Sequence, residues 1–212
     1  RDIIWRSRTN KALPLLAQNI SDQNTDSVTR LKYFRAFDFI DDPSKEKTLL
    51  TLLEDNSNRN DIVITALNHL QPATVSKSPK AKEALEKTLT SLQGSQEFLD
   101  LVRRYKVKDR NEALMAMVIA HPDSSIGVEA ASLLLTSGGT DLMKNALNSK
   151  DEKMASAAIK ALGRAGTKES VAMMKSIVVN PSMAMPVRET AVRTLANGWS
   201  EAQVLLDMFK EG

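Results

Sequence analysis

The sequence predicts an all-α fold, an α-α superhelix (solenoid) of about seven antiparallel helix pairs. Three observations predict it: apolar residues recur at helical spacing, the same pattern returns along the chain, and no stretch of useful length alternates like a strand. A single helix pair of this size cannot bury both of its apolar faces, so successive pairs must cover one another. Stacked at the usual helix spacing, the pairs would form a gently curved rod roughly 60–70 Å long.

The clearest helix pair runs from Ser149 to Val179. Its two helices carry apolar stripes at the spacing of one helix face, Met154, Ala158, Ile159 and Leu162 in the first and Val171, Met174, Ile177 and Val178 in the second. Ser149 followed by Glu152 predicts a capping box at the start of the first helix. Gly163 and Gly166 are expected to end that helix, and Thr167 to cap the next.

The stripe of the first helix returns at three other places. It recurs 33 residues later, 28 residues earlier and once more near the N-terminus, as Val187/Ala191/Val192/Leu195, Ile126/Ala130/Ala131/Leu134 and Ile62/Ala66/Leu67/Leu70. Alanine returns at the second position of each stripe, where a small side chain lets two helix backbones approach closely. Repetition of helix pairs with a period in this range is typical of α-solenoids.

The remaining helices are justified by caps, apolar spacing and turn residues. In the first half of the chain we expect the tail of one helix and a second helix within 1–20, a helix over 27–40, one that follows Asp42 with Pro43 at its first position, and one over 60–70. Further helices are expected after Ser78 with Pro79, from Ser95 to Tyr105, and from Asp109. We also expect a pair within 124–147 that turns at Gly138 and Gly139, and a last pair within 186–209 whose second helix is capped by Ser200 with Gln203. The segment 71–78 contains proline and is expected to be a long connection.

Composition restricts the class of protein more than its function. Of 212 residues, 42% are hydrophobic and 26% are charged, with a net charge of +3, which is ordinary for a globular chain. The chain has no cysteine, which excludes disulfides, thiolate metal sites, cysteine nucleophiles and covalent haem attachment within it. No apolar run is long enough for a membrane span. Because the chain opens on Arg1, we expect residues 1–212 to be one repeat domain excised from a larger protein.

The chemistry-bearing residues do not form a recognisable catalytic or metal-binding pattern. His69 and His121 are the only histidines, and we expect a satisfied or semi-buried histidine at position 69 and a helix-end histidine at position 121 rather than ligands. The carboxylate pairs at 41–42 and 54–55 are expected to cap helices, and the glycines at 138–139 and 163–166 follow no strand and are expected to be turns. We therefore predict no catalytic residue, no cofactor-binding residue and no metal ligand.

Lysine and arginine residues concentrate in the middle of the chain, at Lys77, Lys80, Lys82, Lys87, Arg103, Arg104, Lys106 and Lys108. On a curved scaffold such a basic face could hold DNA through its phosphates. Acidic residues are interleaved with them, which favours a solvated face and makes nucleic acid an unlikely partner. Trp199 is expected to pack between repeats, with an interface anchor as the alternative. The sequence at 19–21 also fits the pattern of a glycosylation acceptor.

The helix-pair pattern resembles HEAT repeats of the armadillo-like class. The segment PVRETAVRTLANG, residues 186–198, is similar to that repeat, with Val187, Arg188, Ala191 and Leu195 at the positions that it usually fills. Other repeats of this chain lack the arginine, so their resemblance depends on apolar spacing alone. The resemblance implies an α-solenoid that presents an extended surface to protein partners.

The N-terminal part is similar to a narrower family. DIIWRSRTNKALPLLAQNI followed by LKYFRAFDF resembles the segment before the cytochrome c domain in large secreted bacterial haem-binding, membrane-bound-dehydrogenase-like proteins. That resemblance implies a β-propeller domain before this segment, a CxxCH haem domain after it and an extracytoplasmic location. Because no CxxCH occurs here, it assigns no cofactor to these residues; help in holding a neighbouring domain's haem is a third possibility.

Two hypotheses about function follow. The first is a non-catalytic scaffold or spacer that docks a protein partner or neighbouring domains of the same chain, with no insertion into membranes. The second is a HEAT-like nucleic-acid binder or DNA glycosylase that uses a basic concave face. Mixed charge on the helix surfaces favours the first, and one sign of charge around a deep cleft favours the second.

Overall fold

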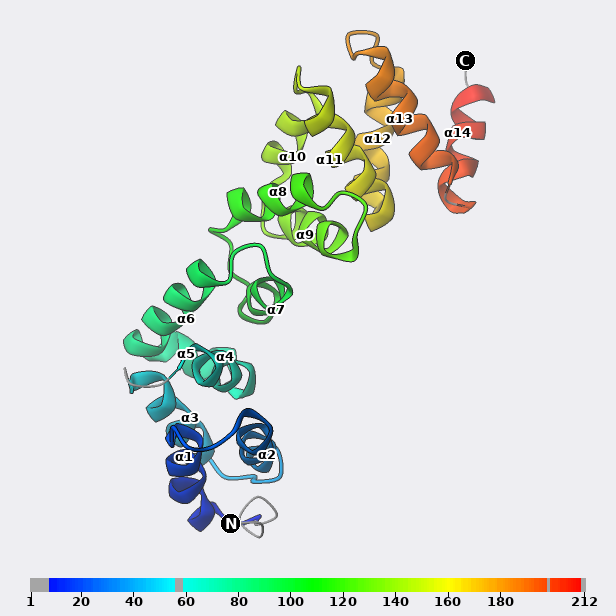
Figure 1. Ribbon diagram of the computed structural model, residues 1–212. Helices are drawn as coiled ribbons and strands as arrows, with labels where there is room; N and C mark the ends of the chain where they lie inside the picture. The colour runs from blue at the N-terminus through cyan, green and yellow to red at the C-terminus, as the bar shows by residue number, and fades with distance from the viewer. Residues whose placement is uncertain (1–7, 56–58, 198, 211–212) are drawn as a thin grey trace. The chain divides into compact units, whose positions relative to one another are not determined.

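The structure, a computed structural model, describes residues 8–55, 59–197 and 199–210. Within these ranges the chain is helical and has no β-strand, so the all-α prediction is confirmed. The helices are η2 (Asn10–Ala12, a short 3-10 helix), α1 (Leu13–Ser21), α2 (Ser27–Phe37), α3 (Ser44–Glu54), α4 (Asn60–His69), α5 (Pro72–Lys77), α6 (Pro79–Ser91), α7 (Gln96–Tyr105), α8 (Asn111–Ala120), α9 (Ser125–Thr136), α10 (Thr140–Leu147), α11 (Glu152–Ala165), α12 (Lys168–Val179), α13 (Met185–Ala196) and α14 (Trp199–Lys210). Every helix except α5 lies where the sequence predicts one (Figure 1).

The chain divides into two compact units, Arg1–Leu92 and Gln93–Gly212. In the N-terminal unit α1 packs against α3 and α3 against α6, while α2 packs against α1 and α4. Figure 1 shows α2 and α4 on one side of the row formed by α1, α3 and α6. The core of this unit contains two phenylalanines and a set of aliphatic side chains that are almost fully buried: Leu13, Leu16, Ile20, Phe34, Phe37, Ile40, Leu49, Leu52, Ile62, Leu67 and Leu70.

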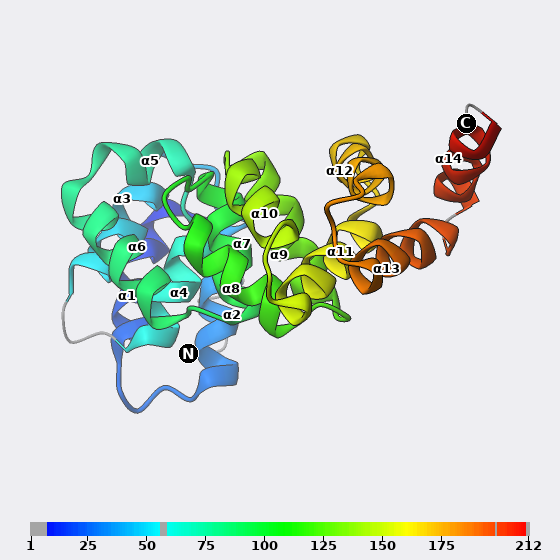
Figure 2. The same ribbon diagram turned by 90° about the horizontal axis from the view of Figure 1, so that it is seen from above.

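In the C-terminal unit the odd-numbered helices pack against one another in chain order. The helix α7 packs against α9, α9 against α11 and α11 against α13. The even-numbered helices pack on this series. The helix α8 contacts α9, α10 and α11; α12 contacts α11 and α13; and α14 contacts α13. Figure 2 shows α12 and α14 on the same side of α11 and α13.

The repeated apolar stripe is largely buried, as the periodicity predicts. Its alanines, Ala66, Ala130, Ala158 and Ala191, are inaccessible to solvent. The residue that follows each alanine is also buried in α4, α9 and α11, but Val192 in α13 is 39% exposed. Met154 and Ile126, the first residues of their stripes, are half-buried. The stripe therefore marks the packed face of each helix, with one exception at α13.

Several predicted helix ends are confirmed by their hydrogen bonds. The Thr167 hydroxyl accepts from the Ser170 N–H at 3.1 Å, and the Ser95 hydroxyl from the Phe98 N–H at 3.2 Å. The Ser78 hydroxyl likewise accepts from Ala81 N–H at the start of α6. Gly166 follows α11 with φ +59°, in the left-handed region that favours glycine at this position.

Asp42 also serves a helix start, although α3 begins one residue later than predicted. Its carboxylate accepts from the Ser44 N–H at 2.8 Å and the Ser44 hydroxyl, and from Asn10 Nδ2 at 2.7 Å. These hydrogen bonds, those from the Ser44 side chain first, hold the pKa of Asp42 below its ordinary value. The carboxylate therefore joins η2 to the first residue of α3.

Two predicted capping boxes are wrong. The cap of α11 is Asp151 rather than Ser149, because the Asp151 carboxylate accepts from the N–H groups of Lys153 and Met154. A carboxylate at this position also interacts favourably with the helix dipole, which a serine hydroxyl does not match. Ser200 lies inside α14, which begins at Trp199, so it is not the cap of that helix.

The segment 71–78 is not the predicted long connection. Its central residues form the short helix α5, Pro72–Lys77, which packs against α6. Pro72 stands in the first turn, where its missing N–H costs nothing and its fixed φ suits the helix. Val75 is buried, so packing supplies the stabilisation that so short a helix cannot supply itself.

Gly163 does not end its helix, as the sequence predicted, but lies within α11. A Cβ atom at this position would overlap the side chain of Thr194 in α13, with 3.2 Å to Thr194 Cβ. The residue is therefore a site of close helix approach. The predicted helix tail near Arg1 falls partly on 1–7, outside the described residues.

An arginine at the fourth position of a helix fastens it to the end of the preceding helix in two places. Arg30 of α2 donates from Nε to the Ile20 carbonyl at 2.8 Å, and Arg188 of α13 from Nε to the Val178 carbonyl at 3.0 Å. In both cases the acceptor lies ten residues earlier in the chain. Helix C-termini leave their last carbonyls without intrahelical partners, so a guanidinium there satisfies an acceptor that packing would otherwise bury unpaired.

Candidate functional site

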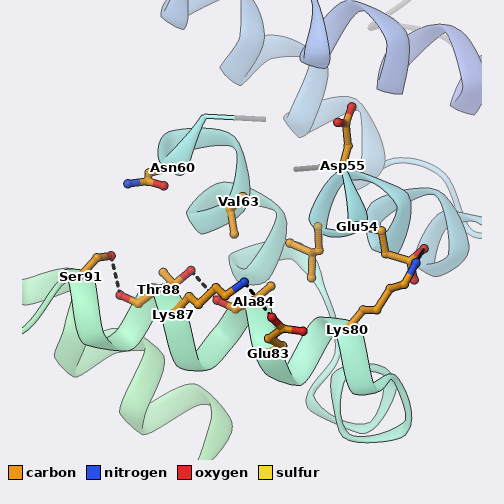
Figure 3. A pocket seen from close by; sticks show the side chains of 11 residues that line it. Glu54, Asp55, Asn60, Val63, Lys80, Glu83, Ala84, Lys87, Thr88 and Ser91 are labelled. Carbon is orange, nitrogen blue, oxygen red and sulfur yellow. Dashed lines mark hydrogen bonds and ion pairs between the residues drawn. The ribbon is translucent and has the colours of Figure 1, made fainter. Parts of the chain in front are cut away.

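The candidate site is a groove of about 590 Å³ in the N-terminal unit. It lies where the end of α3, the first half of α4 and one face of α6 meet (Figure 3). The residues that line it are Leu53, Glu54, Asp55, Asn60, Val63, Lys80, Glu83, Ala84, Lys87, Thr88 and Ser91. The α6 members recur at intervals of three or four residues, with two adjacent pairs at 83–84 and 87–88, so helical periodicity places them on one side of that helix.

Two ion pairs lie along the groove, as Figure 3 shows. Lys80 Nζ lies 3.6 Å from Glu54 Oε2 and so connects α6 to the end of α3. Lys87 Nζ lies 2.7 Å from Glu83 Oε1, one helical turn away. The hydrogen bond from Lys87, with its charge, holds the pKa of Glu83 below its ordinary value. Pairs this exposed add little to stability, so a ligand with charged groups could exchange with them.

The two hydroxyl side chains that line the groove form hydrogen bonds within α6. Thr88 is buried and donates from its hydroxyl to the Ala84 carbonyl at 2.7 Å, and the Ser91 hydroxyl donates to the Thr88 carbonyl at 2.9 Å. Both hydroxyls therefore donate their hydrogen bonds to the backbone of their own helix and not to a side chain that could act as a general base. The groove is thus lined by charged side chains and by hydroxyls bonded to their own helix, with Leu53, Val63 and Ala84 as its apolar members.

His69 is held by two neighbours from α2 and its C-terminal end. Its Nδ1 lies 3.0 Å from Asp38 Oδ1, and its ring stacks on Phe34 with centroids 5.6 Å apart. The side chain is 20% exposed. This arrangement matches the prediction of a satisfied, partly buried histidine, which here connects the last residue of α4 to the end of α2.

His121 follows the end of α8 and is exposed, as predicted for a helix-end histidine. Its carbonyl accepts from the N–H and the hydroxyl of Ser124, both at 3.2 Å. His69 belongs to the N-terminal unit and His121 to the C-terminal unit. Among the described residues, no three histidine or acidic side chains gather as a metal site would require.

Three of the basic residues singled out in the sequence, Lys80, Lys87 and Arg103, have acidic partners. Besides the two pairs in the groove, Arg103 forms an ion pair with Glu129 and lies 3.6 Å from Asp100. Of the acidic residues interleaved with them in the sequence, Glu83 and Asp100 are therefore also neighbours in space. This agrees with the prediction of a mixed, solvated face. Within the described ranges, no helix is both long and apolar enough to cross a bilayer.

Sequence reasoning placed some residues correctly and missed the groove. The carboxylate pair at 54–55 lies at the end of α3, as predicted for capping and solvation of a helix end, and both residues also line the groove. The spacing of Lys80, Glu83 and Lys87 on one helix face was the sequence signal for the groove. The sequence alone did not show which other helices lie opposite that face. The side chain of Trp199 lies outside the described part of the structure. Asn19 lies within α1 and donates to the Leu15 carbonyl at 2.7 Å.

No protein-family model, curated protein or solved structure matches this chain.

Proposed function

We propose that this chain is a non-catalytic scaffold for protein interactions, built as a HEAT-like α-solenoid. The observation that carries the proposal is the series α9, α11 and α13, which pack in turn and each bury an alanine at the same position of the repeated stripe, Ala130, Ala158 and Ala191. Helices that cover one another through a repeated face are the building principle of a solenoid. Its partners are a protein or neighbouring domains of the same polypeptide.

The surfaces of the helices support binding rather than catalysis. The groove beside α6 offers paired lysines and carboxylates, whose ordinary role is recognition of charged side chains and exclusion of mismatched partners. His69, whose imidazole lies beside the Asp38 carboxylate, is stacked on Phe34 and lies outside the set that lines this groove. An interaction role needs no further chemistry from these residues.

Small-angle X-ray scattering tests the architecture. A compact globule of 212 residues has a radius of gyration of about 17 Å. We expect a value clearly above this, because stacked helix pairs extend along one direction. Far-ultraviolet circular dichroism on the same sample controls for unfolding, which would also raise the radius. A helical sample with a radius near that of the globule would contradict the solenoid.

A salt titration of duplex DNA binding tests the alternative function, a nucleic-acid binder or DNA glycosylase with a basic concave face. We expect no binding at about 50 mM salt, because Lys80, Lys87 and Arg103 each have a carboxylate partner. Fluorescence anisotropy of a labelled duplex measures this, with a basic DNA-binding protein as the positive control. Binding that weakens steeply with salt would favour the alternative.

The N-terminal resemblance extends the proposal to a parent protein. It suggests a segment of a secreted bacterial haem or dehydrogenase-like protein, in which these helices would space or dock the redox domains outside the cytoplasm. Part of that resemblance falls on 1–7, outside the described residues. A signal peptide upstream and a CxxCH motif downstream in the parent reading frame would support this placement, and their absence would remove it.

A further inference from the structure

A second groove lies in the C-terminal unit and differs in character from the first. It has a volume of about 270 Å³ and is lined by the end of α12 and the first three turns of α13, through Val178, Met185, Arg188, Glu189, Val192 and Arg193. Three of these six side chains are apolar, two are arginines and one is acidic. Methionine and arginine are enriched at protein interfaces, the first for its adaptable shape and the second for its planar donor group.

The apolar side chains of this groove are unusually accessible. Met185 is 63% exposed, and Val179, next to the lining residue Val178, is 64% exposed. Val192 occupies the stripe position at which Leu67, Ala131 and Ile159 are buried by neighbouring helices. At this helix the repeated face thus continues onto an accessible surface. We refer to the six lining residues as the α13 groove.

The charges on the α13 groove indicate what would cover it. Its two guanidinium groups outnumber its one carboxylate, so it carries a positive excess. Arg193 is 81% exposed and lies 3.7 Å from Glu189, a distance and exposure at which an ion pair is weak and easily replaced. Arg188 is fixed by the bond from its Nε to Val178, so part of the entropic cost of ordering it for a carboxylate is already met.

We propose that the α13 groove docks an amphipathic, acidic segment of a partner protein, with apolar side chains against Met185 and Val192 and a carboxylate on the arginines. This inference rests on the interaction role proposed above and assigns it a surface and a class of ligand. A helix with apolar residues at i and i+4 and acidic residues beside them has the required pattern. Binding is expected to be moderate, because the groove is small.

Two synthetic helical peptides test the proposal. Both carry the same leucine pair at i and i+4, and one is flanked by glutamates where the other has lysines. We expect the acidic peptide to bind the full chain with a dissociation constant below about 1 mM and the basic peptide to bind at least about tenfold more weakly. Fluorescence anisotropy gives both constants, and ¹³C-methyl methionine spectra locate the site through Met185, whose signal is assigned with Met185→Leu.

Three variants make the test specific. Arg193→Glu should weaken the acidic peptide about tenfold, and Met185→Asp should reduce its binding similarly. The matched control is Val28→Asp, an equally exposed apolar residue of the N-terminal unit, which should change nothing. Equal binding of both peptides, no binding of either, or no effect of Arg193→Glu overturns the proposal. Binding that leaves the Met185 signal unmoved overturns this location but leaves the interaction role standing.

Discussion

Replacing Gly127 by alanine is expected to cost about 3 kcal/mol of stability in the C-terminal unit. Gly127 lies in the first turn of α9, and a Cβ atom there would overlap the His121 carbonyl oxygen and lie 2.7 Å from its carbonyl carbon. The obstacle is backbone, which cannot rotate away as a side chain does. Alanine ordinarily stabilises a helix by up to about 1 kcal/mol over glycine, so a loss would oppose helix propensity.

Hydrogen exchange in increasing urea, measured on peptides from α8, α9 and α11, gives the free energy of opening of this unit. Gly163→Ala is the matched comparison, because its obstacle is the Thr194 side chain. Adding Thr194→Ala should recover much of the stability lost in Gly163→Ala, whereas adding His121→Ala should recover none of that lost in Gly127→Ala. An unchanged or increased stability of Gly127→Ala would show that the α8–α9 connection does not pack as described.

These glycines illustrate what the sequence could and could not predict. The all-helical class and most helix boundaries follow from local chemistry. A serine or threonine before an apolar period correctly predicted the N-caps Ser78, Ser95 and Thr167, and a glycine after such a period correctly predicted the C-cap Gly166. Gly163 has the same local appearance as a helix end. Its actual reason, the approach of α13, involves a residue 31 positions away that periodicity does not identify.

The same limit applies to the surfaces. The repeated stripe predicted the burial of Ala158 and Ala191, because every helix in a stack needs one covered face. It also predicted a buried Val192, which is exposed, since the extent of cover depends on how the next helix is placed. The groove beside α6 likewise arises from three helices that only the fold brings together. Local pattern thus predicted the packed face, whereas the grooves depend on the arrangement of several helices.

The arginine of α2 provides the second large expected effect. Arg30 is almost fully buried and donates to three acceptors: the Ile20 carbonyl at 2.8 Å, the Asp22 carbonyl at 3.1 Å and Asp61 Oδ2 of α4 at 3.4 Å. It therefore joins the end of α1 to the first turn of α4 through α2. Arg30→Met keeps the length and apolar stem but leaves these acceptors without the guanidinium. We expect a loss of about 3 kcal/mol in the N-terminal unit, since hydrogen bonds to charged groups contribute about 1.5–3 kcal/mol each.

Arg30→Lys should recover only part of this loss, because an ammonium group cannot reproduce the fork that reaches two carbonyls and a carboxylate at once. Arg35→Met, an exposed arginine of the same helix, is the matched control and should change stability little. Hydrogen exchange of α1, α2 and α4 peptides measures all three. Arg188→Met should cost less than Arg30→Met, because the side chain of Arg188 is only half-buried. If Arg30→Met and Arg35→Met proved equally stable, the Arg30 guanidinium would not be what holds α2 against its neighbours. Apolar packing of Phe34 and Phe37 alone would then have to account for the position of that helix.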